Sequence, residues 1–422
     1  MSNINYTSFL LNLKDPNLDF NDSSYCLDTI NSVETMVITA ILKNKPEICP
    51  CCGHNKINIH GYKTSSIKIP PISEYAAILK LKKQRYVCKK CGKTFIAKTT
   101  IVNKNCFISN NTKLAVADNA CKKISEKDIA QRYNISHNTV SRVINSFYEI
   151  HKVNHNYLPE ALCFDEFKST KNADGAMSFI FTDAYTHKVI DIVEDRRLYR
   201  LEKYFNRFTK KARKNVKFVV MDMYSPYISL VKKCFPKAQI IFDRFHIINS
   251  LSRALNKTRI KIMNSKKEFY NKFKNYYKLL LKPINKLNGI QTRKFKCFNK
   301  LMTQYDIVKF LLNQDKELKN TYFAYQDFLA AIKNMDCIKL EQLISKQYNE
   351  ISEYMKVAIK TIKKFKPYII NSVKYNLSNG QLEGINNKIK TLKRIAFGYR
   401  SFYNFKNRIL IMCHLICIKN VA

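Results

Sequence analysis

The stretch ALCFDEF, residues 161–167, is an apolar run that ends in acidic side chains. Two later stretches repeat this pattern: VKFVVMDMYSPY at 216–227 and AQIIFDRFH at 238–246 are each apolar up to an aspartate. Short apolar runs bounded by polar residues are typical of buried strands. The residues that follow the second aspartate, YISLVKKCF, have helical spacing. We therefore predict a sheet whose later strands alternate with helices.

Two further strands lie between the first and second of these stretches. SFIFTDA and VIDIVED are separated by the turn sequence YTHK, and LYRLEKYFNRF then has helical spacing. An antiparallel set of strands therefore comes first, and alternating helices and strands follow. This order predicts a mixed sheet with helices on both faces.

The acids at the ends of these strands are candidate metal ligands. Asp165 and Asp222 each follow an apolar run, and such carboxylates point into the crevice where α/β sheets carry out chemistry. A single acid there is commonly a loop cap, whereas two in a basic protein favour Mg²⁺. Bare carboxylates would raise each other's pKa, and a divalent ion removes that conflict. Two ions about 4 Å apart would stabilise an in-line displacement at phosphorus.

Composition favours a polyanionic partner. The chain has 422 residues, which suggests about two to four domains. Its net charge is +42, which favours nucleic acid, although an A/T-rich coding sequence would also enrich lysine. No run of eighteen apolar residues occurs, so we expect no membrane span, and the N-terminus lacks a basic leader. We expect a cytoplasmic protein without a membrane partner.

Two cysteine pairs predict a zinc site. Cys49 and Cys52 form one C-x-x-C pair, and Cys88 and Cys91 form the other. Four thiolates close a tetrahedral shell, so the Zn²⁺ would be structural. Cys51 is expected to be a spectator, although its exchange with Cys52 stays open. Strand-like stretches between the pairs fit a zinc ribbon.

The next stretch, ISEKDIAQRYNISHNTVSRVINSFYE, predicts two helices joined by a short turn. Ser125 with Asp128 is a candidate capping box, and Ser136 is a candidate N-cap for a second helix over 137–148. This is the helix-turn-helix pattern, which an ordinary helical hairpin also produces. Polar side chains on the outer face of the second helix are of types that contact base edges. The expected base readers are His137, Asn138, Thr139 and Arg142.

A single acid stands in the basic stretch SNGQLEGINNKIKTLKR, residues 378–394. Glu383 would lie near a helix start, and Asn386 and Lys390 would share its face. Lys393 and Arg394 would project to the flanks and bind backbone phosphates. A surface ion pair is the alternative to a metal ligand at Glu383.

LCFDEF, VVMDMYSPY, FDRFH and SNGQLEGINNKIKTLKRIAFGYRSFYNFKNRIL resemble the DDE transposases of bacterial insertion sequences, specifically the ISL-three (ISL3) family. The resemblance covers nearly the whole chain. It implies a ribonuclease-H-like catalytic domain with a catalytic triad at Asp165, Asp222 and Glu383. A D-x-x-H signature falls on Asp243 and His246, whose role stays open between orienting the scissile phosphate and orienting a loop.

The resemblance also implies the reaction. Such an enzyme binds terminal inverted repeats, uses two Mg²⁺ or Mn²⁺ ions to hydrolyse a phosphodiester, and joins the freed 3′-hydroxyl to target DNA. Paired ends imply a homodimer or larger assembly, associated with the nucleoid when bound to DNA. Two alternatives remain: a DNA-binding regulator without catalysis, and a metal-dependent nuclease that does not join ends.

These observations predict a multidomain α+β chain. Residues 264–371 are expected to form an all-α insertion with its aromatics in the core, and its lysines are either a solvated face or a DNA track. The N-terminal residues are expected to form a short helical arm. The predicted parts are an arm (1–45), a zinc ribbon (46–105), a helix-turn-helix domain (106–152), a ribonuclease-H-like mixed α/β domain (155–263 and 372–422) and the insertion (264–371).

Overall fold

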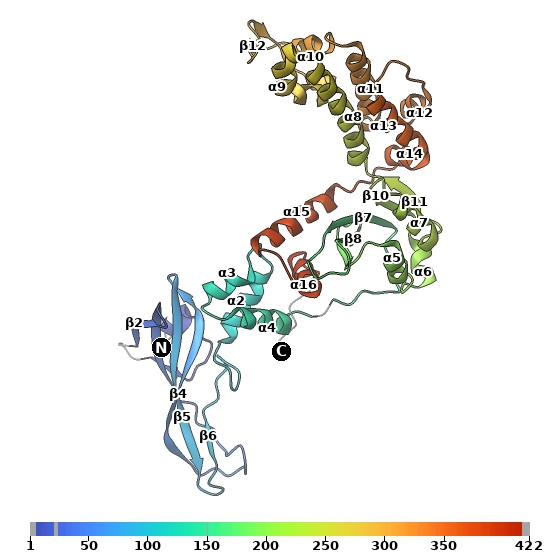
Figure 1. Cartoon of the computed structure of the whole chain (residues 1–422). Helices are drawn as coiled ribbons and strands as arrows, with labels where there is room; N and C mark the ends of the chain where they lie inside the picture. The colour runs from blue at the N-terminus through green and yellow to red at the C-terminus, as the bar shows by residue number, and fades with distance from the viewer. Residues whose placement is uncertain (1–5, 21–23, 150, 416–422) are drawn as a thin grey trace. The chain divides into compact units, whose positions relative to one another are not determined.

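The computed structural model describes residues 6–20, 24–149 and 151–415 (Figure 1). The outer ends of the predicted arm and of the last predicted segment, 1–5 and 416–422, lie outside these residues. The chain divides into two compact units, residues 1–152 with 388–422 and residues 153–387. Among the described helices, none combines the length and apolar character needed to cross a bilayer.

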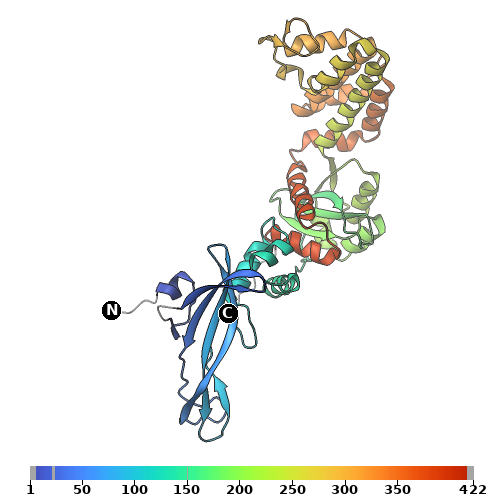
Figure 2. The ribbon, with the colours of Figure 1, turned by 60° about the vertical axis from the view of Figure 1, so that its left-hand side comes forward.

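The first unit contains a six-stranded sheet. Strands β4 and β5 form a long antiparallel hairpin and lie side by side in Figures 1 and 2. The sheet order is β1-β3-β5-β4, with β2 on β3 and β6 on β5. Its elements, with the short helix before them, are α1 (Tyr6–Leu10), β1 (Leu18–Asp19), β2 (Tyr25–Ile30), β3 (Val33–Leu42), β4 (Ile57–Ile72), β5 (Tyr75–Cys88) and β6 (Thr94–Ile96).

The N-terminal residues differ from the helical arm we expected. Among residues 6–20 and 24–45, which the structure describes, only α1 is helical, and the stretch from 18 to 42 contributes three strands. β3 pairs in parallel with β5 and buries Val37, Ile38 and Leu42 in the core of the sheet. The β-branched residues of this stretch therefore find a long-range partner, which overrides any local helical tendency.

Three helices follow the sheet: α2 (Asn110–Ala120), α3 (Glu126–Arg132) and α4 (His137–Phe147). The capping box of Ser125 and Asp128 is present, and the side chain of Ser136 caps α4. Ile129 of α3 and Val140 of α4 are buried where the helices meet. Both predicted helices thus begin at the predicted caps.

The C-terminal residues of the first unit pack on these helices. α15 (Gly380–Ile395) is followed by α16 (Phe402–Met412), which contacts α2. Arg408 of α16 is 2% exposed, and its guanidinium donates to the backbone oxygens of Ala120, Lys122 and Ile124. Residues 388–422 therefore belong to the same compact unit as residues 1–152.

The second unit is built on a five-stranded sheet of order β11-β10-β7-β8-β9. β7, β8 and β9 are antiparallel, and β10 and β11 run parallel to β7. Phe164, Phe179 and Phe205 pack together in the core beside the sheet. The elements are β7 (Ala161–Lys168), β8 (Met177–Asp183), β9 (Val189–Val193), α5 (Leu198–Phe205), α6 (Lys210–Asn215), β10 (Phe218–Met221), α7 (Ser225–Cys234) and β11 (Gln239–Phe242).

A helical segment follows the sheet, and its helices gather into one group (Figure 2). α8 and α11 lie against each other, and α13 packs on α8. The buried Tyr322, Tyr325 and Phe328 of α11 place aromatics in this core, as expected. The segment is not all-α, because β12 (Arg293–Lys294) and β13 (Leu301–Met302) pair. The helices are α8 (Arg244–Ser265), α9 (Tyr270–Leu281), α10 (Gln304–Leu312), α11 (Lys316–Lys333), α12 (Cys337–Ser345), α13 (Glu353–Lys364) and α14 (Lys366–Lys374), with short 3-10 turns at Lys267–Phe269 and Ile284–Lys286.

Candidate active site and zinc site

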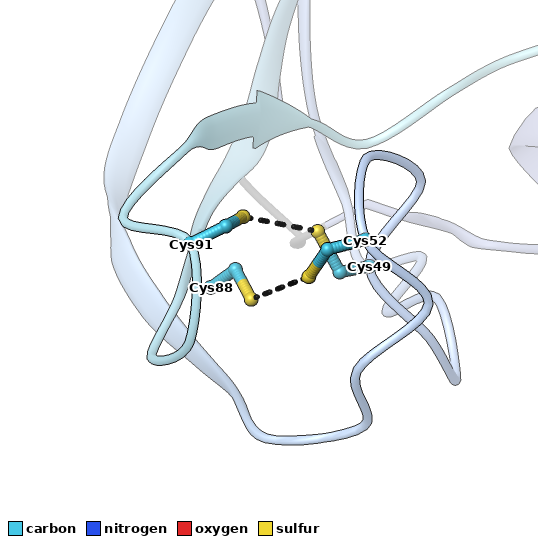
Figure 3. A group of neighbouring side chains, drawn as sticks. All are labelled: Cys49, Cys52, Cys88 and Cys91. Atoms are coloured by element: carbon cyan, nitrogen blue, oxygen red, sulfur yellow. Dashed lines mark hydrogen bonds between the residues drawn. The ribbon is translucent and has the colours of Figure 1, made fainter.

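Four cysteines in the first unit point toward one another from two loops (Figure 3). The Sγ atoms of Cys49 and Cys91 are 3.8 Å apart, and those of Cys52 and Cys88 are 3.6 Å apart. A zinc ion about 2.3 Å from each of four tetrahedral sulfurs requires edges of about 3.8 Å. The four ligand atoms therefore already have the spacing of a closed, structural zinc site.

The backbone of each loop favours thiolates. The N–H groups of Gly53 and Gly92 donate to the carbonyls of Cys49 and Cys88, and both glycines have a positive φ that favours this residue type. Burial alone would raise the pKa of the Cys49 thiol, but N–H donation from the next residues lowers it to about 6. The pKa of Cys52 is instead raised to about 12. Zn²⁺ binds thiolates, so a bound ion would take the place of the protons that these thiols carry.

Cys51 and Cys52 provide a matched pair for testing this site. Cys51 is exposed and lies outside the cluster, so the structure places Cys52, and not Cys51, among the four neighbouring cysteines. We expect Cys52→Ser to lose the zinc ion and Cys51→Ser to retain one ion per chain, as measured by plasma mass spectrometry of purified protein. Retention of zinc by Cys52→Ser would show that Cys52 is not a ligand and that the proposed set of four cysteines is wrong.

In the second unit, three aspartates lie at one level of the sheet. β10 pairs with β7 through Val220 and Cys163, so Asp222 continues this register beside Asp165. β10 pairs with β11 up to Met221 and Phe242, so Asp222 also lies level with Asp243. The sequence predicted Asp165 at the end of a strand. Asp165 lies inside β7 instead, because the pairing of β7 with β8 extends to Lys168.

The first turn of α8 supplies a histidine to this level. His246 Nε2 is 3.0 Å from Asp222 Oδ1, and this contact together with the nearby carboxylates raises the pKa of the imidazole. Ligand atoms of Asp222, Asp243 and His246 all lie within 4.8 Å of one another. The D-x-x-H stretch therefore places both of its ends in the acidic site.

Asp165 is held by a residue far away in the sequence. Asn386 of α15 donates from Nδ2 to Asp165 Oδ2 at 2.7 Å, and the Glu166 N–H donates to Oδ1 at 2.7 Å. Burial raises the pKa of Asp165 to about 6, and the neighbouring Asp222 carboxylate adds to this shift. A cation bound here would relieve this repulsion.

Glu383 lies between two asparagines that face the acidic site. Asn379 Nδ2 donates to the carbonyl oxygen of Phe164 at 3.1 Å, and Asn386 contacts Asp165. Glu383 is four residues after the first and three before the second, which is the spacing of one helix face. It is exposed, and it does not belong to the compact group of Asp222, Asp243 and His246.

A cavity of about 710 Å³ opens beside these acids. Its α8 wall continues from His246 through Ser250 and Arg253 to Lys257, residues three or four apart on one helix face. The wall therefore combines cations with the acids, which suits a phosphate-bearing substrate. Among its lining residues are Asp165, Asp222, His246, Arg253, Lys257 and Glu353.

Comparison with known proteins identifies the family. A family model described as transposase, of the ISL3 DDE type, matches residues 162–409. The chain belongs to the ISL3 family of DDE transposases. A second model, described as the zinc-finger of transposase IS204/IS1001/IS1096/IS1165, matches residues 45–91 of this transposase and includes all four cysteines.

Two curated relatives match the transposase to different extents. A Lactococcus lactis subsp. lactis protein named ATP-dependent protease is 44% identical over 110 residues, which are 26% of this chain and 35% of that protein. The transposase for insertion sequence element IS1001 of Bordetella parapertussis is 22% identical over 369 residues, 84% of this chain and 86% of that protein. The chain thus spans about a third of the first relative and most of the second.

The predicted DNA contacts of the transposase have different environments. His137, Asn138 and Arg142 are exposed on α4, and Thr139 is half-buried. On α15, Lys390 and Arg394 are exposed, and Lys393 is half-buried over the Phe405 ring.

The prediction that Asn386 contacts DNA needs correction. Its side chain is buried and its amide is engaged by Asp165 and the Glu166 carbonyl. Helical spacing predicts which residues share a face of α15 but not what that face packs against.

The sequence analysis missed Asn379 and the basic wall of α8. The spacing from His246 to Arg253 and Lys257 could have revealed the α8 wall, because all three share one helix face. No local pattern indicates Asn379, whose partner Phe164 is 215 residues away.

Proposed function

We propose that the protein binds the terminal inverted repeats of an insertion sequence, cleaves DNA there in a metal-dependent reaction, and joins the freed end to target DNA. The meeting of Asp165, Asp222, Asp243 and His246 at one level of a mixed sheet supports this most strongly. The strand order, with an antiparallel trio followed by parallel strands, supports a ribonuclease-H-like catalytic domain.

The donor set fits hard divalent cations. Carboxylate oxygens of Asp165, Asp222 and Glu383 are the ligand type that Mg²⁺ and Mn²⁺ prefer. Two such ions would supply a nucleophilic water and stabilise the leaving oxygen. Asn386 keeps Asp165 in place, and Asn379 fixes the start of the helix that carries Glu383. Arg253 and Lys257 would bind backbone phosphates at the cavity wall.

Metal affinity is expected to rise with pH up to about pH 7. Burial raises the pKa of Asp165 to about 6 and also raises the pKa of Asp243, and the hydrogen bond to Asp222 raises the pKa of His246. Each group must lose its proton to favour a cation, so affinity falls as the pH drops through these values. We expect calorimetric Mn²⁺ affinity at pH 5 to be at least about tenfold weaker than at pH 7. Equal affinities would contradict this description of the site.

DNA recognition is assigned to the first unit. α3 and α4, joined by a short turn with exposed polar side chains on α4, support a helix-turn-helix. In such motifs the first residues of the second helix contact base edges. The zinc site would stabilise the adjoining ribbon. Simultaneous binding of two element ends would require a dimer or a larger assembly.

Substitutions on α4 test this assignment. We expect Arg142→Ala or Asn138→Ala to reduce the preference for inverted-repeat DNA over random DNA by about tenfold or more, because base contacts carry discrimination. Asn145→Ala, at the other end of the same helix, is the control and is expected to change little. Binding titrations at fixed salt measure both affinities. Unchanged discrimination in the first two variants would remove α4 from base recognition.

The name of the Lactococcus relative does not lead to a second proposal. The sequence has no G-x-x-x-x-G-K-[ST] stretch, the phosphate-binding loop of P-loop ATPases. The G-K-T of residues 92–94 belongs instead to a cysteine knuckle, where Gly92 follows Cys91.

One assay separates the three classes considered. Labelled inverted-repeat DNA is incubated with the protein, Mg²⁺ or Mn²⁺ and a target plasmid. We expect nicked or cut ends and joined products. Binding alone would indicate a regulator, and cutting without joining would indicate a nuclease, so either result would overturn the proposal.

A further inference from the structure

The connection between α15 and α16 exposes an aromatic ring. Phe397 is 98% exposed, more than any other large apolar side chain in the part of the chain that the structure describes. Single exposed apolar residues are common, but a fully exposed phenylalanine contributes little to folding. The backbone conformation of Phe397 is a second unusual feature of this residue.

Phe397 occupies a position that favours glycine. The Gly398 N–H donates to the Lys393 carbonyl and the Phe397 N–H to the Arg394 carbonyl, which is the Schellman arrangement at a helix C-terminus. In this arrangement the residue at 397 is left-handed, and its φ is 51°. That conformation is unfavourable for a bulky side chain. Folding alone would favour glycine here, so the phenylalanine indicates a function.

The surroundings of Phe397 are basic and well anchored. No aspartate or glutamate follows Glu383 in the sequence. Arg394 and Arg400, three residues before and three residues after Phe397, are both exposed. Two residues beyond Phe397, Tyr399 stacks on the buried Phe405 with ring centroids 4.8 Å apart. The connection therefore presents one ring from a fixed base among cations that attract phosphates.

We propose that Phe397 is a DNA wedge that stacks on a base of the bound element end and unstacks its neighbour. This inference rests on the proposed function, because it takes element-end DNA as the ligand. Aromatic rings stack on bases of any sequence, and apolar wedges part base steps and kink the duplex. Arg394 and Arg400 would hold the backbone on either side, and the ring would part the stack.

Fluorescence of 2-aminopurine tests this directly, because its emission rises when the base is unstacked. The probe is an inverted-repeat duplex with 2-aminopurine at successive positions near the cleavage site. We expect the wild-type protein to increase emission severalfold at one or two adjacent positions. Phe397→Ala is expected to abolish this increase, and Phe397→Trp to keep it. Phe9→Ala removes another highly exposed phenylalanine, 77% exposed and outside the basic segment, and should match the wild type.

A cleavage assay with modified DNA completes the test. Phe397→Ala is expected to cut the matched duplex at least tenfold more slowly, and a mismatch at the unstacked position should restore its rate. Phe397→Gly should show the same defect without a lower melting temperature, because glycine suits the backbone.

The outcomes are distinguishable from failure of the proposed function. If the wild type neither binds nor cuts element ends, the function itself is wrong. If it cuts, and Phe397→Ala still increases 2-aminopurine emission, the wedge is wrong. A changed sedimentation mass with unchanged emission would make the ring a protein contact and would also overturn the proposal.

Discussion

Replacing Asp222 by asparagine is expected to abolish cleavage and joining of element ends while leaving end binding within about threefold of the wild type. Asp222 is the central acid of the site, level with Asp165 and Asp243 and in contact with His246. An amide keeps the shape of the side chain but removes the charge that a divalent cation requires. We expect a rate loss on the order of 10³-fold or more, measured with labelled ends in Mg²⁺ and in Mn²⁺.

Glu353→Gln is the matched control for this variant. Glu353 lines the same cavity, but it is exposed and pairs with Lys356 at 2.7 Å. Its amide variant should cut and join at nearly the wild-type rate. Strand transfer by Asp222→Asn at a comparable rate would show that the acidic site does not carry the chemistry.

Replacing Arg408 by alanine is expected to unfold or loosen the helices assigned to DNA recognition. The guanidinium of Arg408 is buried and donates to three backbone oxygens around the end of α2 and the loop before α3. Its loss leaves these carbonyls without their donor, and each such buried group costs about 1–3 kcal/mol. We expect the free energy of unfolding to fall by about 3 kcal/mol or more, measured by urea denaturation and circular dichroism.

Two variants make the Arg408 result interpretable. Arg408→Lys retains the charge but cannot reproduce the planar fork, so it should recover only part of the stability. Arg400→Ala removes an exposed arginine of the same segment, and its effect on stability should stay within about 0.5 kcal/mol. Wild-type stability in Arg408→Ala would mean that α16 does not support the recognition helices.

The parts that the sequence predicted well are governed by local patterns. Apolar runs ending in acids marked the strands around Asp165 and Asp222, and the paired cysteine spacing marked the zinc site. The caps at Ser125 and Ser136 likewise predicted where α3 and α4 begin. Each strand, cap and C-x-x-C pair depends on residues within a few positions of one another, and the two pairs were joined by their repeated spacing.

The parts that the sequence did not predict depend on distant partners. The strand β3 finds its neighbour β5 in parallel, and nothing in residues 33–42 indicates that pairing. Arg408 looked like one cation among many, yet it is buried against carbonyls 284 or more positions away. The sequence predicts Asn386 as a DNA contact, but its side chain donates to Asp165, which is 221 positions away.

The location of the catalytic metal tests the central claim most directly. Two overlapping ligand sets are to be distinguished: the triad of Asp165, Asp222 and Glu383 that the family resemblance implies, and the compact group of Asp222, Asp243 and His246 that the structure brings together. Anomalous diffraction from a Mn²⁺ complex with element-end DNA locates the ions. We predict manganese between Asp165 and Asp222 with Glu383 as a ligand. Manganese bound only by Asp222, Asp243 and His246, with Glu383 far from the ion, would contradict this account.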